Sequence, residues 1–165
     1  MHFSLAAGLA FIACATALPH ELVAGRANTI VALTSTSSYN WTVTDWTAVN
    51  DDANSTFSFS VSAPSTTEGG STIPPFDAVC SGTGINTGPW PCTGLPAATN
   101  TSEAAVNAYL QTSNDSSLAA VVISYQYATI SGGWETEYNW TAYASEPWGT
   151  GLTFETSPSY VWGVA

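Results

Sequence analysis

The sequence predicts an all-β domain: a single antiparallel β-barrel or sandwich of about seven to eight strands with one disulfide-pinned loop. Apolar and polar residues alternate with a period of two in many short segments, and helical periodicity is nearly absent. Clusters of Gly, Pro, Asn and Ser separate these segments. The 165 residues include seven Trp, seven Tyr and six Phe, enough for one hydrophobic core. Short strands with such turns are typical of sandwiches and barrels.

The first half of the chain carries three expected strands. Residues 39–48 alternate apolar with polar side chains and change phase part-way, which predicts a β-bulge near Asp45. Residues 57–63 alternate Phe, Phe, Val and Ala with serines and form the clearest half-buried strand. Residues 76–80 form a third, shorter strand, and residues 50–54 predict a hairpin loop.

The second half continues the pattern. Residues 104–110 suit either a strand or a helix. Residues 119–129 are apolar on both faces at first, which predicts a central strand. Residues 134–140 alternate aromatic with polar side chains, and the last expected strands begin at 152 and end at 164.

The amino terminus has the features of a secretory leader. Residues 5–16 are apolar or small, and Ala15-Thr16-Ala17 fits the small-residue cleavage rule. The apolar stretch is too short to span a bilayer. We therefore expect a signal peptide over 1–17, a short pro-segment or flexible N-terminus over 18–27, and a single β domain over 28–165. The protein is expected to be secreted and extracellular.

Cleavage of the leader simplifies the cysteine content. Cys14 is removed with it, and Cys80 and Cys92 remain. An even pair in an oxidising compartment predicts a disulfide between them.

Asn-x-Ser/Thr sequons predict a glycoprotein. They begin at Asn40, Asn54, Asn100, Asn114 and Asn139. Asn40 precedes Trp41 and Asn139 precedes Trp140. Because neighbours on a strand point to opposite faces, each glycan is expected in solvent and each Trp in the core.

The charged composition excludes several kinds of partner and chemistry. Twelve acidic residues accompany a single basic one, Arg26, which gives a net charge of −11. Nucleic acids and anionic membranes require cationic side chains, so neither is an expected partner. No Lys, Arg or His follows residue 26. His-based nucleophile systems, His-ligated metals and Lys Schiff bases are therefore excluded for the domain, and we expect no catalytic residues, metal or cofactor.

Two sets of residues remain as candidates for a site. Glu135 and Glu137 lie two residues apart, roughly 7 Å along a strand, and could act in glycoside hydrolysis, although a solvated outer face explains them more simply. Trp90, Trp134 and Trp148 are candidate ligand-binding aromatics. For Trp90, which lies between two prolines, plugging one end of the fold is the alternative role.

Four short motifs occur along the domain: WTVTDW (41–46), FSFSV (57–61), FDAVCSG (76–82) and VWGVA (161–165). With these motifs the chain resembles small secreted proteins of filamentous fungi, similar in layout to the Alternaria major-allergen family of β-barrels. The resemblance implies a secreted, often dimeric β-barrel that acts in host interaction, as an effector, elicitor or allergen, without established catalysis. Family members commonly carry two disulfides and sometimes a cysteine that links a dimer. This chain retains only one pair, so a homodimer is expected to be non-covalent.

These observations together predict a secreted fungal non-enzymatic glycoprotein that acts through surface binding. The expected partner is a host protein or a cell-wall glycan. A carbohydrate-binding module is the alternative function, and a carboxylate-dependent glycoside hydrolase is the third.

Overall fold

The computed structural model describes residues 28–31, 39–51, 54–68, 71–95, 104–131 and 133–164. All regular secondary structure in these ranges is β-strand, and every pairing between strands is antiparallel. The strands are β1 (Asn28–Val31), β2 (Trp41–Val49), β3 (Thr56–Ala63), β4 (Thr66–Glu68), β5 (Ser71–Ile73), β6 (Phe76–Thr83), β7 (Trp90–Pro91), β8 (Ala105–Gln111), β9 (Leu118–Ser131), β10 (Trp134–Pro147), β11 (Gly149–Thr156) and β12 (Pro158–Val164).

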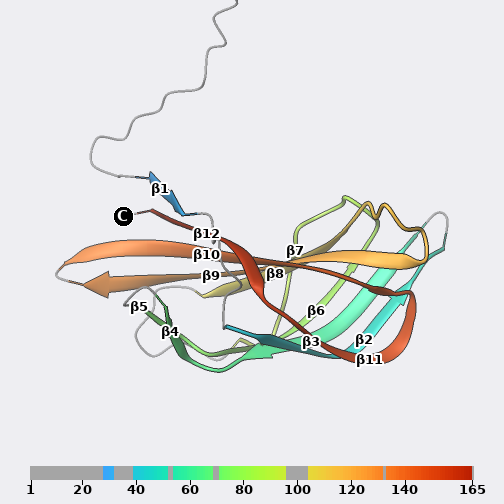
Figure 1. Ribbon diagram of the computed structural model, residues 1–165, viewed down its shortest axis with the longest axis horizontal. Coiled ribbons are helices and arrows are strands. Elements are labelled where there is room, and N and C mark those ends of the chain that lie inside the picture. The colour runs from blue at the N-terminus through green and yellow to red at the C-terminus, as the bar shows by residue number, and fades with distance from the viewer. Residues whose placement is uncertain are drawn as a thin grey trace, which may run out of the picture.

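The strands form two packed layers and a small accessory hairpin (Figure 1). One layer is a six-stranded sheet in the order β1-β12-β10-β9-β8-β7, and the other is a four-stranded sheet in the order β11-β2-β3-β6. Strands β4 and β5 pair only with each other. The predicted all-β antiparallel class is confirmed as a sandwich, whereas the single closed barrel is wrong because the pairing divides into separate sheets.

The predicted count of seven to eight strands is also too low for the described part of the chain. The polar stretch between β3 and β6, for which periodicity predicts no strand, folds back on itself as β4 and β5. Strand β7 is only two residues long, and β11 begins at Gly149, earlier than expected. Short polar strands lack a hydrophobic alternation, so periodicity does not reveal them.

The core lies between the two sheets and is rich in aromatic rings. Trp41 and Phe76 from the four-stranded sheet make an edge contact, with ring centroids 5.2 Å apart. Phe76 in turn packs against Tyr125 of the six-stranded sheet at 4.4 Å. Such ring pairs bury large apolar areas and add a geometric preference to the packing.

The predicted bulge in β2 is confirmed. Asp45 has a φ of 55°, and the register between β2 and β3 shifts between Thr44 and Thr47. The inserted residue reverses the phase of the strand, so Trp46 points into the core, as Trp41 does, despite their odd separation. The phase change in the sequence therefore has a direct structural cause.

The segment expected as a central strand is confirmed as β9, which lies between β8 and β10. Strand β8 resolves the ambiguity of residues 104–110 in favour of a strand. Strands β9 and β10 pair over their full 14 residues and form the longest hairpin of the described chain. This hairpin forms the centre of the six-stranded sheet.

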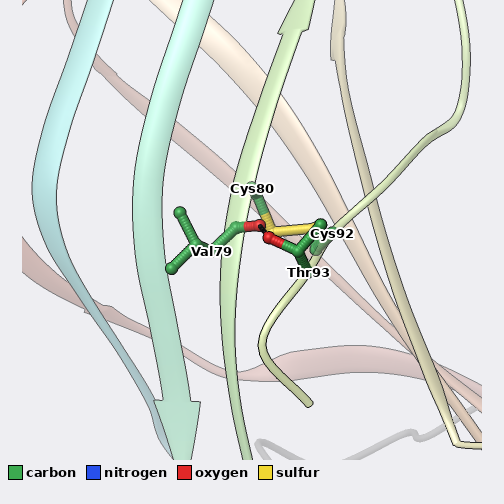
Figure 2. Close-up of a disulfide and its surroundings, with 4 residues drawn as sticks. All are labelled: Val79, Cys80, Cys92 and Thr93. Carbon is green, nitrogen blue, oxygen red and sulfur yellow. Dashed lines mark hydrogen bonds between the residues drawn. A yellow bond between two sulfur atoms is a disulfide. The ribbon is translucent and has the colours of Figure 1, made fainter.

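One side of the sandwich is closed by the predicted disulfide, which is confirmed. The bond joins Cys80 on β6 to Cys92, just after β7, and thus links the two sheets. Beside it, Val79 and Thr93 exchange two backbone hydrogen bonds of 2.7 and 2.8 Å (Figure 2). The Cys92 amide also donates to the Val106 carbonyl on β8 at 2.8 Å. Covalent and hydrogen bonds therefore act together at this edge.

Candidate functional site: the outer face of the six-stranded sheet

The outer face of the six-stranded sheet carries a row of tyrosines. Ile123 on β9 points into the core, so its neighbour Val122 points outward. The register pairs Val122 with Tyr109 on β8 and with Tyr143 on β10. Tyr143 is 51% exposed, whereas Val122 between the two rings is only 3% exposed, which indicates that its neighbours cover it. Tyr109 and Tyr143 thus lie on either side of Val122 on this face, and we call these three residues the tyrosine row.

The next two rows consist mainly of amide and hydroxyl side chains, with one alanine and one tryptophan. The first runs Asn107, Ser124, Thr141 and Tyr160 across β8, β9, β10 and β12. The second runs Ala105, Gln126, Asn139 and Trp162 across the same strands. We refer to these two rows and the tyrosine row together as the outer face. Its side chains combine flat aromatic rings with neutral hydrogen-bonding groups.

One end of the outer face is hollowed. The hollow has a volume of about 490 Å³. Its lining residues come from β9, β10 and β12 and are Gln126, Tyr127, Ala128, Glu135, Glu137, Tyr138, Asn139 and Trp162. Asn139 and Trp162 are direct cross-strand partners within it. The hollow therefore offers an indole ring, two amides and two carboxylates to whatever occupies it.

The two carboxylates of the hollow lie side by side. Glu135 and Glu137 are both exposed, come from the same strand, and are paired by register with Ile130 and Ala128 of β9. Residues two apart on a strand point in the same direction. Glu135 and Glu137 therefore form a shared acidic edge of the hollow.

The three predicted ligand-binding tryptophans are not brought together. Trp90 is 38% exposed, covers Gly82 and donates its Nε1 hydrogen to the Thr83 carbonyl at 3.2 Å, so it closes the edge between the sheets. Trp148 is half-buried against the core, and its Nε1 donates to the Ser116 carbonyl at 3.1 Å. Trp134 begins β10, at the opposite end of that strand from Trp148, and its side chain lies outside the described residues.

The sequons lie on the surface wherever the structure describes them. Asn40, Asn54 and Asn114 are exposed, and Asn139 is half-buried on the outer face. Asn100 lies outside the described residues. Trp41 and Trp140 are buried in the core, as the alternation predicts for residues that follow Asn40 and Asn139.

Beneath the hollow, the core contains a group of buried tyrosines. Burial raises the pKa of Tyr127 to about 12, although the hydrogen bond from Trp140 Nε1, 3.3 Å from its hydroxyl, opposes this. Burial also raises the pKa of Tyr39 and Tyr125. These hydroxyls are held protonated at neutral pH and serve packing.

The described ranges contain no helix of a length and hydropathy that would cross a membrane. They also contain no group of three or more His, Cys, Asp or Glu side chains placed to hold a metal ion.

The chain matches no known protein family, and neither its sequence nor its fold matches a characterised protein or a solved structure.

The aromatic residues of the outer face are not among those proposed from the sequence. Tyr109 and Tyr143 lie at positions of the alternation opposite to the core, and that signal is present in the sequence. Their convergence depends on the register of three strands, because Tyr109 and Tyr143 are both paired with Val122. Periodicity within a strand does not reveal the register between strands.

Proposed function

We propose that this protein is a secreted, non-enzymatic glycoprotein that binds a neutral carbohydrate chain, such as a cell-wall glycan, on its outer face. The observation that carries the proposal is the tyrosine row at Val122, with rows of amides and hydroxyls beside it. Sugar rings present C–H faces that pack on aromatic rings and hydroxyls that bond to amides, and aromatic surfaces with a few polar groups recognise such ligands. The Cys80–Cys92 disulfide is compatible with an extracellular protein.

The charge of the protein favours a neutral ligand. The net charge is −11, and the outer face with its hollow carries Glu135 and Glu137 but no cationic side chain among the described residues. Anionic polymers would be repelled by this field. Neutral polysaccharides are not repelled, and their hydroxyls can donate to carboxylates at the edge of the face.

Binding without hydrolysis is supported by the exposure of the acidic pair. Glu135 and Glu137 are both exposed on the outward side of β10, where charged side chains are ordinary and require no catalytic role. After Arg26 the sequence holds no Lys, Arg or His, so His-based and Lys-based acid–base or nucleophile systems are absent. We therefore propose that the pair contributes to binding at most.

The resemblance to fungal secreted proteins supports a role at the contact between a fungus and its surroundings, as an effector, elicitor or allergen-like protein. A glycan-binding surface would hold such a protein on a wall. A host protein is the competing partner, and the experiment below separates the two because purified polysaccharides contain no protein.

Retention on insoluble polysaccharides tests the proposal. The secreted protein is incubated with chitin, β-glucan or cellulose, and the protein left in solution is measured. We expect at least one polysaccharide to deplete it and soluble oligosaccharides of the same sugar to release it. Retention on none of the three would contradict carbohydrate binding. Release of reducing ends that Glu135→Gln and Glu137→Gln abolish would contradict the non-enzymatic assignment.

A further inference from the structure

We infer that the N-glycan attached at Asn139 lies in the hollow at the end of the outer face, with its first N-acetylglucosamine packed against the indole ring of Trp162. The inference rests on the secreted glycoprotein part of the proposed function and is independent of carbohydrate binding by the tyrosine row. It assigns an occupant to the hollow and a structural role to one sequon among several.

The sequon has its polar side chains on the required face. Asn139 and Thr141 both point outward from β10, and the Thr141 hydroxyl donates to Asn139 Oδ1 at 3.3 Å. Trp140 between them is 5% exposed and packs in the core. Glycan transfer in the secretory pathway forms a bond from Asn139 Nδ2 to C1 of the sugar, breaks the bond of C1 to its lipid diphosphate carrier, and releases the diphosphate and an amide proton. The sugar then leaves the sheet on the side of the hollow.

The neighbours of Asn139 suit a sugar. Trp162 is directly opposite on β12, and Gln126 is directly opposite on β9. Cross-strand partners have Cβ atoms about 5 Å apart, so the indole is within reach of the first sugar. Gln126 provides an amide, and the small side chain of Ala128 leaves space beside it. The volume of about 490 Å³ falls within the range of roughly 300–1,000 Å³ for small-ligand sites.

The glycan would occupy only one end of the outer face. Tyr143 is four residues along β10 from Asn139, which corresponds to roughly 13 Å of strand. The tyrosine row is therefore left open. The glycan would cover Trp162, which is half-exposed in the bare chain.

The chain contains a matched control for this sequon. Asn40-Trp41-Thr42 is the same tripeptide as Asn139-Trp140-Thr141, and its Trp is also buried. Asn40 is surrounded by polar groups: its Nδ2 lies 3.5 Å from Glu155 Oε2, and its Oδ1 accepts from the Ser157 hydroxyl at 2.6 Å. The two sites thus differ in the aromatic neighbour and share the local sequence.

Site-resolved deglycosylation of the native secreted protein tests the inference. A peptide N-glycosidase cuts the bond at Nδ2, and mass spectrometry of the peptides follows each site over time. We expect the glycan at Asn139 to be released about tenfold more slowly than that at Asn40, because the enzyme must lift it from the ring. The variant Trp162→Ala should raise the rate at Asn139 to that at Asn40, and denaturation should make the two rates equal.

Three results would overturn the inference: an unmodified Asn139 in the secreted protein, equal release from both sites in the native state, or an unchanged rate at Asn139 in Trp162→Ala. If that variant is not secreted in folded form, Trp162→Leu replaces it, because leucine retains apolar bulk without a flat ring.

The midpoint of thermal unfolding adds a second readout. Loss of the glycan through Asn139→Gln should lower the midpoint in the wild type, and less so in the Trp162 variant.

Discussion

Gly82 is the residue at which the packing of the two sheets leaves no room for a side chain. A Cβ atom built there would lie 2.4 Å from Trp90 Cδ1 and 2.7 Å from Phe57 Cε1. Both are ring atoms, and the Trp90 ring is further fixed by its hydrogen bond to Thr83. Gly82 therefore allows Trp90 to close the edge of the sandwich.

We predict that Gly82→Ala lowers the free energy of unfolding by about 1–3 kcal/mol, because the added methyl group overpacks this edge. Urea unfolding followed by tryptophan fluorescence measures the change. The neighbouring variant Ser81→Ala, on the exposed side of β6, is the control and should change stability by less than about 0.5 kcal/mol. Equal stability of the two variants would show that Trp90 moves without cost.

The buried tyrosines predict a loss of stability at alkaline pH. Their ordinary pKa is about 10, and burial raises the pKa of Tyr127 to about 12. Above pH 10 the unfolded chain releases protons that the folded chain retains, so unfolding becomes more favourable as the pH rises from 10 toward 12. Below pH 10 this contribution to stability is fully present.

Urea midpoints measured between pH 8 and 12 should therefore fall above pH 10, with tyrosinate absorbance at 295 nm rising during unfolding. Tyr127→Phe should make the fall shallower, because one of the shifted groups is removed. A midpoint that stays level through this range would show that the hydroxyls are hydrated in the folded protein.

At the scale of the elements, the strands that carry a hydrophobic alternation could be predicted and the others could not. The reversed phase around Asp45 and the apolar start of β9 are local signals, and both were interpreted correctly. Strands β4, β5 and β7 are too short or too polar to leave such a signal. The choice between barrel and sandwich depends on pairing between distant strands, such as β10 with β12, that local patterns do not encode.

The candidate site was less predictable for the same reason. The tryptophans were selected by residue type, and Trp90 and Trp148 make hydrogen bonds that fix them at separate places in the fold. The surface aromatics gather through register, with Tyr109 and Tyr143 on either side of Val122. The orientation of Asn139 was predictable, whereas its pairing with Trp162 was not.

The Cys80–Cys92 disulfide is expected to stabilise the edge between the two sheets. The bridge spans 12 residues of sequence, and closing a loop of this length lowers the entropy of the unfolded chain, which stabilises the folded protein by about 3 kcal/mol. The double variant Cys80→Ala and Cys92→Ala should lose about this much stability, measured by urea unfolding. The backbone bonds between Val79 and Thr93 should keep the edge folded in the variant at low urea. Unchanged stability would mean that these bonds alone hold the edge.

At the scale of the whole molecule, the two sheets differ in their outward chemistry. The outward residues of β3 are serines and threonine, as expected for a solvated face, whereas the outer face of the six-stranded sheet carries Tyr109, Tyr143, Tyr160 and Trp162. The net charge of −11 is expected to favour solubility and to repel anionic surfaces. The molecule is therefore expected to bind through one face only.

The assignment of the outer face as the binding surface is tested most directly by affinity for a soluble oligosaccharide. The oligosaccharide is taken from the polysaccharide that retains the protein. Isothermal titration compares the wild type with Tyr109→Ala/Tyr143→Ala and with Val49→Ala, an exposed apolar residue on the four-stranded sheet. We predict that the double tyrosine variant binds at least about tenfold more weakly while it remains folded, and that Val49→Ala binds as the wild type does. Equal affinity of all three proteins would contradict the assignment of the outer face as the binding surface.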